Sequence, residues 1–109
     1  MPNNKPQIEQ LFHAMADPTR LAVLQQLSEA PSSVTELAKP FNMALPSFMQ
    51  HLAVLEKNDL VKSSKKGRKR TYTLKPETLT IAEGWLEKRR LQWEQRLDRL
   101  DAYLKTMKE

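Results

Sequence analysis

Cysteine is absent from this chain of 109 residues, and only two residues, Gly67 and Gly84, are glycine. The lack of cysteine excludes disulfides and every metal site that is built on thiolates. Two isolated glycines exclude a glycine-rich phosphate-binding loop. No apolar run approaches the roughly 20 residues of a membrane-spanning helix, and no hydrophobic signal-peptide core follows Met1. We therefore expect a cytoplasmic protein that forms a single domain over residues 1–109.

Positive charge is unevenly distributed along the chain. The formal net charge is +5, and the sequence pI is about 9.6. Seven basic residues and no acidic residue lie between Lys62 and Lys75, whereas the other eleven basic residues are outnumbered by thirteen acidic ones. A basic patch on a nearly neutral body indicates a polyanion as partner. A solvated charged loop without any ligand would give the same composition.

Residues 33–58 fit a helix-turn-helix unit that follows two amphipathic helices, the second of which begins at Asp17 and Pro18. Ser33 and Glu36 form an S-x-x-E capping box that opens a short helix. Pro46 then marks the first turn of a longer helix, whose apolar stripe is Phe48, Leu52 and Leu55. Such a unit places its second helix in the major groove of DNA.

Three polar residues are expected to face outward near the start of this second helix. Gln50 suits a contact with adenine, because its amide can donate to and accept from the base edge. Ser47 suits either a DNA contact or a local helix cap. His51 has two open roles, as a DNA contact or as a buried histidine that bonds to the backbone.

Residues 60–74 predict a β-hairpin, which in this position would be the wing of a winged helix. Extended segments at 60–64 and 70–74 flank a longer loop that contains Gly67. The basic side chains at its tip would neutralise DNA phosphates, and they are Lys65, Lys66, Arg68, Lys69 and Arg70.

Residues 77–107 predict one long helix. Its apolar positions alternate by four and three residues, as in a coiled-coil seam, at Trp93, Leu97, Leu100 and Leu104. About 30 residues form a rod of about 45 Å, which is longer than the rest of so small a domain can cover. We expect a second copy of the chain to cover this seam, although the helix folding back on its own domain is the alternative.

Two motifs resemble those of the ArsR-type winged helix-turn-helix repressors. Residues 16–21 read A-D-P-T-R-L, and residues 45–56 resemble the family's recognition helix, which typically ends in H-L-x-V-L. The resemblance covers about residues 8–107. It implies a mainly α fold with a small β-hairpin, a homodimer joined through its terminal helices, and repression from an inverted-repeat operator.

The resemblance also assigns residues to two surfaces. The recognition surface would hold Ser47, Met49, Gln50 and His51, with the wing at residues 63–70. The dimer interface would hold Ile8, Leu11, Phe12, Trp93, Leu97, Leu100 and Leu104. The family usually has serine where this chain has Ala44 and Met49, so a helix cap and one DNA contact are missing.

Many members of this family sense metals through cysteines in the helix-turn-helix or through Asp and His pairs in the last helix. This chain has no cysteine, and its last helix has no histidine. Transition-metal sites need three or four good ligands, so we expect no metal and no other cofactor. The run W-E-x-R-L-D at residues 93–98 resembles metal-independent members.

An enzyme is not expected, because Asp17 is explained as a helix cap and no Ser-His-Asp set can be argued from the spacing. Two alternatives to a sequence-specific regulator stay open. One is a protein-interaction module that dimerises through its last helix. The other is a non-specific nucleic-acid binder, which competition with random DNA would reveal.

Overall fold

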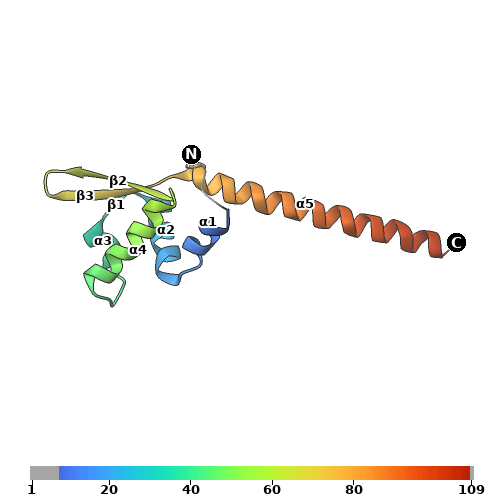
Figure 1. Ribbon diagram of the computed structural model, residues 1–109, viewed down its shortest axis with the longest axis horizontal. Helices are drawn as coiled ribbons and strands as arrows, with labels where there is room; N and C mark the ends of the chain where they lie inside the picture. The colour runs from blue at the N-terminus through green and yellow to red at the C-terminus, as the bar shows by residue number, and fades with distance from the viewer. Residues whose placement is uncertain (1–7, 109) are drawn as a thin grey trace.

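The computed structural model describes residues 8–108 and shows a small head from which one long helix projects (Figure 1). The molecule measures 74 × 37 × 22 Å along its principal axes. Its elements are α1 (Ile8–Met15), α2 (Pro18–Glu29), β1 (Ser32–Ser33), α3 (Val34–Ala38), α4 (Leu45–Lys57), β2 (Val61–Lys66), β3 (Lys69–Leu74) and α5 (Pro76–Met107). The predicted fold, mainly α with a small hairpin, is confirmed. Among the residues described, no helix is both long and apolar enough to cross a membrane.

Local caps explain where the helices of the head begin. The Asp17 carboxylate accepts a hydrogen bond from the backbone N–H of Arg20 at 3.0 Å, with Pro18 in the first turn of α2. The Ser33 hydroxyl caps α3 in the same way. By contrast, α4 begins after Ala44, which has no side chain able to cap it. The sequence predicted all three features.

The junction between α4 and the wing depends on Asp59, whose φ of +61° lies in the left-handed region. Its N–H and that of Leu60 bond back to carbonyls in the last turn of α4, which is a Schellman motif. The Asp59 carboxylate also pairs with Lys75 at 2.5 Å, and its carbonyl accepts from the Thr78 hydroxyl. One residue therefore ties the end of α4 to the start of α5.

The sheet has three antiparallel strands in the order β1-β3-β2. The sequence did not predict β1, because two serines carry no strand pattern. The hairpin loop is also tighter than predicted, since Lys66 pairs with Lys69 and leaves only Gly67 and Arg68 in the turn. Gly67 has a φ of +62°, and a glycine with positive φ at the first of two loop residues is typical of a type II′ turn. The prediction of a five-residue loop was therefore wrong.

A hydrophobic core joins the helices of the head to the sheet. It contains Leu11, Val23, Leu24, Leu27, Leu37, Phe48, Leu52, Leu55, Leu60, Val61 and Tyr72, all buried. Leu11 was predicted at a dimer interface, but it is fully buried inside the head and is not available to a partner. The reason is that α1 packs against α2, α4 and α5, and Leu11 lies on the side that faces inward.

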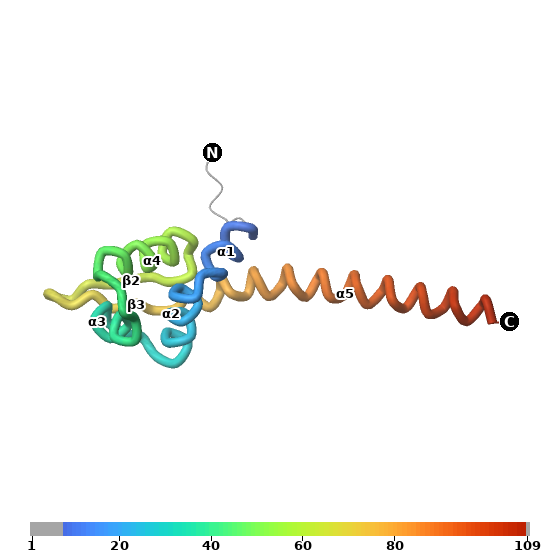
Figure 2. The backbone as a smooth tube through the Cα atoms, turned by 90° about the horizontal axis from the view of Figure 1, so that it is seen from below, coloured from blue at the N-terminus to red at the C-terminus, as the bar shows by residue number. Residues whose placement is uncertain are grey.

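Only the first turns of α5 pack against the head. Thr78 and Ala82 are buried, and Trp85 meets Phe12 of α1 edge to face with 5.5 Å between ring centroids. From residue 83 to residue 107 every position of the helix is exposed. The helix projects away from the head (Figures 1 and 2), so the alternative in which it folds back on its own domain is wrong.

Candidate nucleic-acid interface

Helix α4 presents one face to solvent because its other face is buried in the core. Phe48, Leu52 and Leu55 point inward, as the sequence predicted. The outward positions then follow at helical spacing and are Pro46, Ser47, Gln50, Ala53 and Lys57, all exposed. Ala53 and Lys57 were not among the predicted site residues, although their spacing of three and seven from Gln50 places them on the same stripe.

The four predicted residues of the recognition helix separate into two pairs. Ser47 and Gln50 are exposed and stand on the outward face. Met49 is half-buried and packs against the core. His51 is half-buried too, with 23% of its side chain exposed. The structure therefore brings Ser47 and Gln50 to one surface, while Met49 and His51 are largely engaged inside the head.

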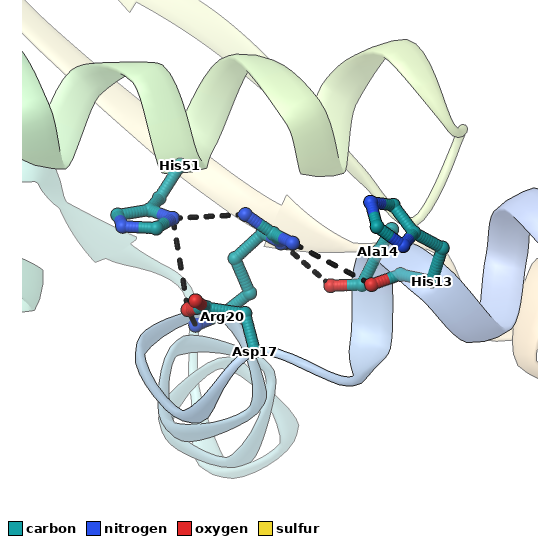
Figure 3. Close-up of polar contacts among 5 residues, drawn as sticks. All are labelled: His13, Ala14, Asp17, Arg20 and His51. Carbon is teal, nitrogen blue, oxygen red and sulfur yellow. Dashed lines mark hydrogen bonds and ion pairs between the residues drawn. The ribbon is translucent and has the colours of Figure 1, made fainter.

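The His51 ring belongs to a polar cluster between α4 and the α1–α2 corner (Figure 3). Its Nδ1 lies 3.0 Å from Nη1 of Arg20 and 3.6 Å from Oδ2 of Asp17. The same guanidinium donates from Nε to the Ala14 carbonyl at 2.7 Å and from Nη2 toward the His13 carbonyl at 3.5 Å. His51 is thus a structural histidine, but its partners are side chains rather than backbone.

Electrostatics within this cluster favour the charged form of Asp17. The backbone N–H of Arg20 donates to the carboxylate and, together with the positive charge of the Arg20 guanidinium, lowers the pKa of Asp17 below its ordinary value. The carboxylate is the N-cap of α2 and also faces His51. One carboxylate therefore serves both the helix start and the contact with α4.

The wing carries its positive charge at the end of the molecule opposite the C-terminus (Figure 2). Lys65, Lys66, Arg68, Lys69 and Arg70 are all exposed. The strand register sets Lys65 opposite Arg70 and Lys66 opposite Lys69. Like charges directly across a strand pair are destabilising, and a bound polyanion would neutralise them. This arrangement supports an anionic partner more strongly than composition alone.

Two residues of the basic stretch are held by neighbours. Arg70 donates to the Ser63 hydroxyl at 2.8 Å, and Ser63 in turn donates to the Glu56 carboxylate at 3.1 Å, so the wing is tied to α4. Lys75 pairs with Asp59, and this hydrogen bond raises the pKa of Lys75. Lys75 therefore belongs to the junction with α5 rather than to the wing.

A hollow of about 450 Å³ connects the wing with the start of α3. Ser33 and Thr35 line it from the helix side, and Arg68, Lys69 and Arg70 line it from the wing. Hydroxyl groups and basic side chains together are the donors that contact DNA phosphates. No group of three or more metal-binding side chains occurs among residues 8–108. The groups that this hollow offers are therefore hydroxyl donors and positive charges, which suit an anionic backbone.

Comparison with known proteins gives concordant results. Residues 15–64 match the model of a helix-turn-helix domain. The HTH-type transcriptional regulator Rv2034 of Mycobacterium tuberculosis is 37% identical over 80 residues, which cover 73% of this chain and 75% of that protein. The transcriptional repressor SdpR of Bacillus subtilis is 29% identical, over 70% of this chain and 84% of that protein.

Solved structures agree with these relatives. The crystal structure of an ArsR family transcriptional regulator shares 48% sequence identity and a TM-score of 0.77, covering 80% of this chain and 96% of that one. An ArsR-like regulator from Rhodococcus sp. RHA1 shares 29% identity and a TM-score of 0.74, covering 85% and 88%. The likeness extends beyond the helix-turn-helix to most of the chain.

Proposed function

Because the chain belongs to the ArsR family and is a DNA-binding transcriptional regulator rather than an enzyme, we propose that it is a repressor that binds an inverted-repeat operator as a homodimer. The observation that carries this proposal is the surface formed by Gln50 and Ser47 on α4 together with the crowded positive charge of the wing. A bound metal has no role in the proposal, since the chain has neither the cysteines nor the last-helix histidines of the metal-sensing members.

The outward face of α4 supplies the groups for reading bases. Gln50 can form two hydrogen bonds with adenine in the major groove, and the small Ala53 beside it leaves room for a thymine methyl group. Ser47 and Lys57 flank these residues and suit phosphate oxygens. The wing would follow the adjacent backbone, where its lysines and arginines displace counterions. Sequence choice therefore comes from α4, and most of the affinity comes from the wing.

The exposed seam of α5 supports the homodimer. Trp93 is 57% exposed, Leu97 46%, Leu100 52% and Leu104 47%, at alternating spacings of four and three. A groove of about 390 Å³ between α1 and α5 continues this apolar surface past Phe12, Met15 and Leu86. Extended apolar patches on soluble proteins mark interaction surfaces, and a second α5 has the matching apolar seam.

Symmetry and relatives support the operator and the repression. A two-fold dimer presents two equal reading helices, and such dimers bind inverted repeats. The relatives that are named repressors include SdpR of Bacillus subtilis and the arsenical resistance operon repressor of Staphylococcus xylosus, the latter 30% identical over 73 residues.

The deciding experiment is binding of the purified, chelator-treated chain to the DNA upstream of its own gene, with excess random DNA as competitor. We expect tight binding that survives the competitor, with two protomers per operator by analytical ultracentrifugation. Binding that the competitor abolishes would indicate the non-specific binder. A dimer that binds no DNA would indicate the protein-interaction module. Gln50→Ala is the matched control, because it should lose preference for the operator while keeping affinity for random DNA.

A further inference from the structure

Arg20 stands where three helices of the head meet, and its guanidinium spans the gap between them (Figure 3). On one side it donates to the carbonyls of Ala14 and His13 at the end of α1. On the other side it contacts Nδ1 of His51 in the middle of α4 at 3.0 Å. Arg20 itself lies in the first turn of α2. A single side chain therefore links α1, α2 and α4.

The helices that Arg20 joins have different tasks in the proposed repressor. Helix α4 carries Gln50, which immediately precedes His51. Helix α1 packs against α5, as the contact between Phe12 and Trp85 shows, and α5 carries the apolar seam. The Arg20–His51 contact is thus a direct polar link from the helix that reads DNA to the pair of helices that would hold two protomers together.

We propose that Arg20, with His51 as its acceptor, is a positioning residue that fixes the angle of α4 relative to α1 and α5. In a homodimer this angle sets the separation of the two reading helices, and hence the half-site spacing that the protein accepts. The inference rests on the proposed function, because it needs two protomers on one inverted repeat. It assigns neither residue a contact with DNA.

The chemistry of the pair explains why these two side chains suit the task. A guanidinium has five donors in a rigid planar fork and no acceptor. Nδ1 of His51 must therefore be the acceptor, which leaves the ring proton on Nε2. The Asp17 carboxylate, 3.6 Å from the same Nδ1, adds a negative charge beside Arg20. In lysine all three donors share one nitrogen, so its side chain does not reproduce an arrangement in which Nε bonds to α1 and Nη1 contacts α4.

Apolar packing holds α4 in the head without this link, but packing defines its angle less sharply. Phe48, Leu52 and Leu55 lie on the buried face and keep the helix attached. Their contacts are non-directional, whereas hydrogen bonds weaken steeply when their geometry is poor. Loss of the Arg20–His51 contact should therefore leave the head folded and widen the range of angles that α4 adopts.

The test compares binding to four DNAs, namely the operator, the operator with one base pair inserted at its centre, the operator with one base pair removed there, and random DNA. Wild type, Arg20→Lys, His51→Leu and His51→Asn are measured side by side. His51→Asn is the rescue variant, because its side-chain oxygen occupies the place of Nδ1. Gln50→Ala is the control that alters base reading without touching the link. Thermal unfolding and sedimentation establish that each variant is folded and dimeric.

We expect wild type to prefer the native spacing, and Arg20→Lys and His51→Leu to reduce that preference by about tenfold, which equals about 1.4 kcal/mol. Affinity for random DNA should be unchanged, and His51→Asn should restore most of the preference. If His51→Leu does not fold, the positioning role is tested by the preference for the native spacing in the other two variants, which should fall in Arg20→Lys and be kept in His51→Asn.

An equal loss on all four DNAs, or an unchanged preference in both disrupting variants, would refute the positioning role and leave the proposed repressor intact. A wild-type protein that shows no preference among spacings would overturn the homodimer on an inverted repeat, and with it this inference.

Discussion

Neutralising one cross-strand pair in the wing should stabilise the protein and weaken its binding to DNA. The pair is Lys66 and Lys69, which face each other directly beside the turn at Gly67. The change is Lys66→Thr together with Lys69→Thr, since threonine favours strands and pairs well with itself. The free protein then loses a repulsion, while the complex loses two positive charges per protomer.

The expected change in stability follows from the strand pairing, and the expected change in salt dependence follows from the number of charges removed. Cross-strand pairs are worth about 0.2–1 kcal/mol, so the free energy of unfolding should rise by about that amount at low salt. The gain should shrink at high salt, because both side chains are exposed and screening is effective there. If all four lysines of a dimer contact phosphates, the slope of log affinity against log salt should become shallower by about 3.6, which is about 0.9 for each charge.

Urea denaturation at low and high salt measures the first effect, and fluorescence anisotropy with labelled operator at several salt concentrations measures the second. Lys88→Gln is the control, because it removes an exposed charge from α5, away from the wing. An unchanged salt slope would remove this pair from the DNA interface. A lower stability in the double variant would refute the argument that the lysines repel each other in the free protein.

Four further predictions concern single positions. Gln50→Ala should reduce discrimination between operator and random DNA by about 1–3 kcal/mol, measured as a ratio of dissociation constants, if the glutamine makes a bidentate contact; equal losses on both DNAs would reassign it to the backbone. Leu100→Glu should give folded monomers in sedimentation equilibrium, and a variant that stays dimeric would contradict the α5 seam. Ala44→Ser should raise the free energy of unfolding by about 0.5–2 kcal/mol by capping α4, and no gain in urea denaturation would mean that this helix start needs no cap. The pKa of Asp17 is lower in the folded chain than its ordinary value of 3.8, so its contribution to stability is present above that value and is lost as the pH falls through the folded pKa. Asp17→Asn should therefore weaken the fall in the free energy of unfolding at acid pH, and an unaltered fall in urea denaturation would contradict the lowered pKa.

Local features of the fold could be predicted from the sequence because they depend on near neighbours. The caps at Asp17 and Ser33, the inward stripe of α4 and the existence of the hairpin all follow from residues within one or two turns of each other. β1 could not be predicted, since Ser32 joins the sheet only by pairing with Tyr72, forty residues later.

The candidate site was harder to predict where roles depend on distant partners. His51 and Arg20 are 31 residues apart, and no periodicity reveals that they meet. Met49 is adjacent to Gln50, yet it packs against the core, because neighbouring helix positions differ by about 100° and only the fold decides which one faces outward. The prediction of Leu11 as an interface residue was wrong for the same reason, since the burial of α1 is set by three other helices.

The exposed rod of α5 has a consequence for how repression would respond to the amount of protein. A helix without tertiary contacts is only marginally stable in water, and α5 is exposed at every position beyond Trp85, the residue that meets Phe12. In the proposed dimer, ordering of the rod and association of two chains are therefore the same event, governed by mass action. Below the dimer dissociation constant, the concentration of competent repressor rises with the square of the protomer concentration. Changes in the synthesis or degradation of the chain would then change repression without a separate inducer. Repression would also respond more steeply to the amount of protein than it would with a monomeric repressor.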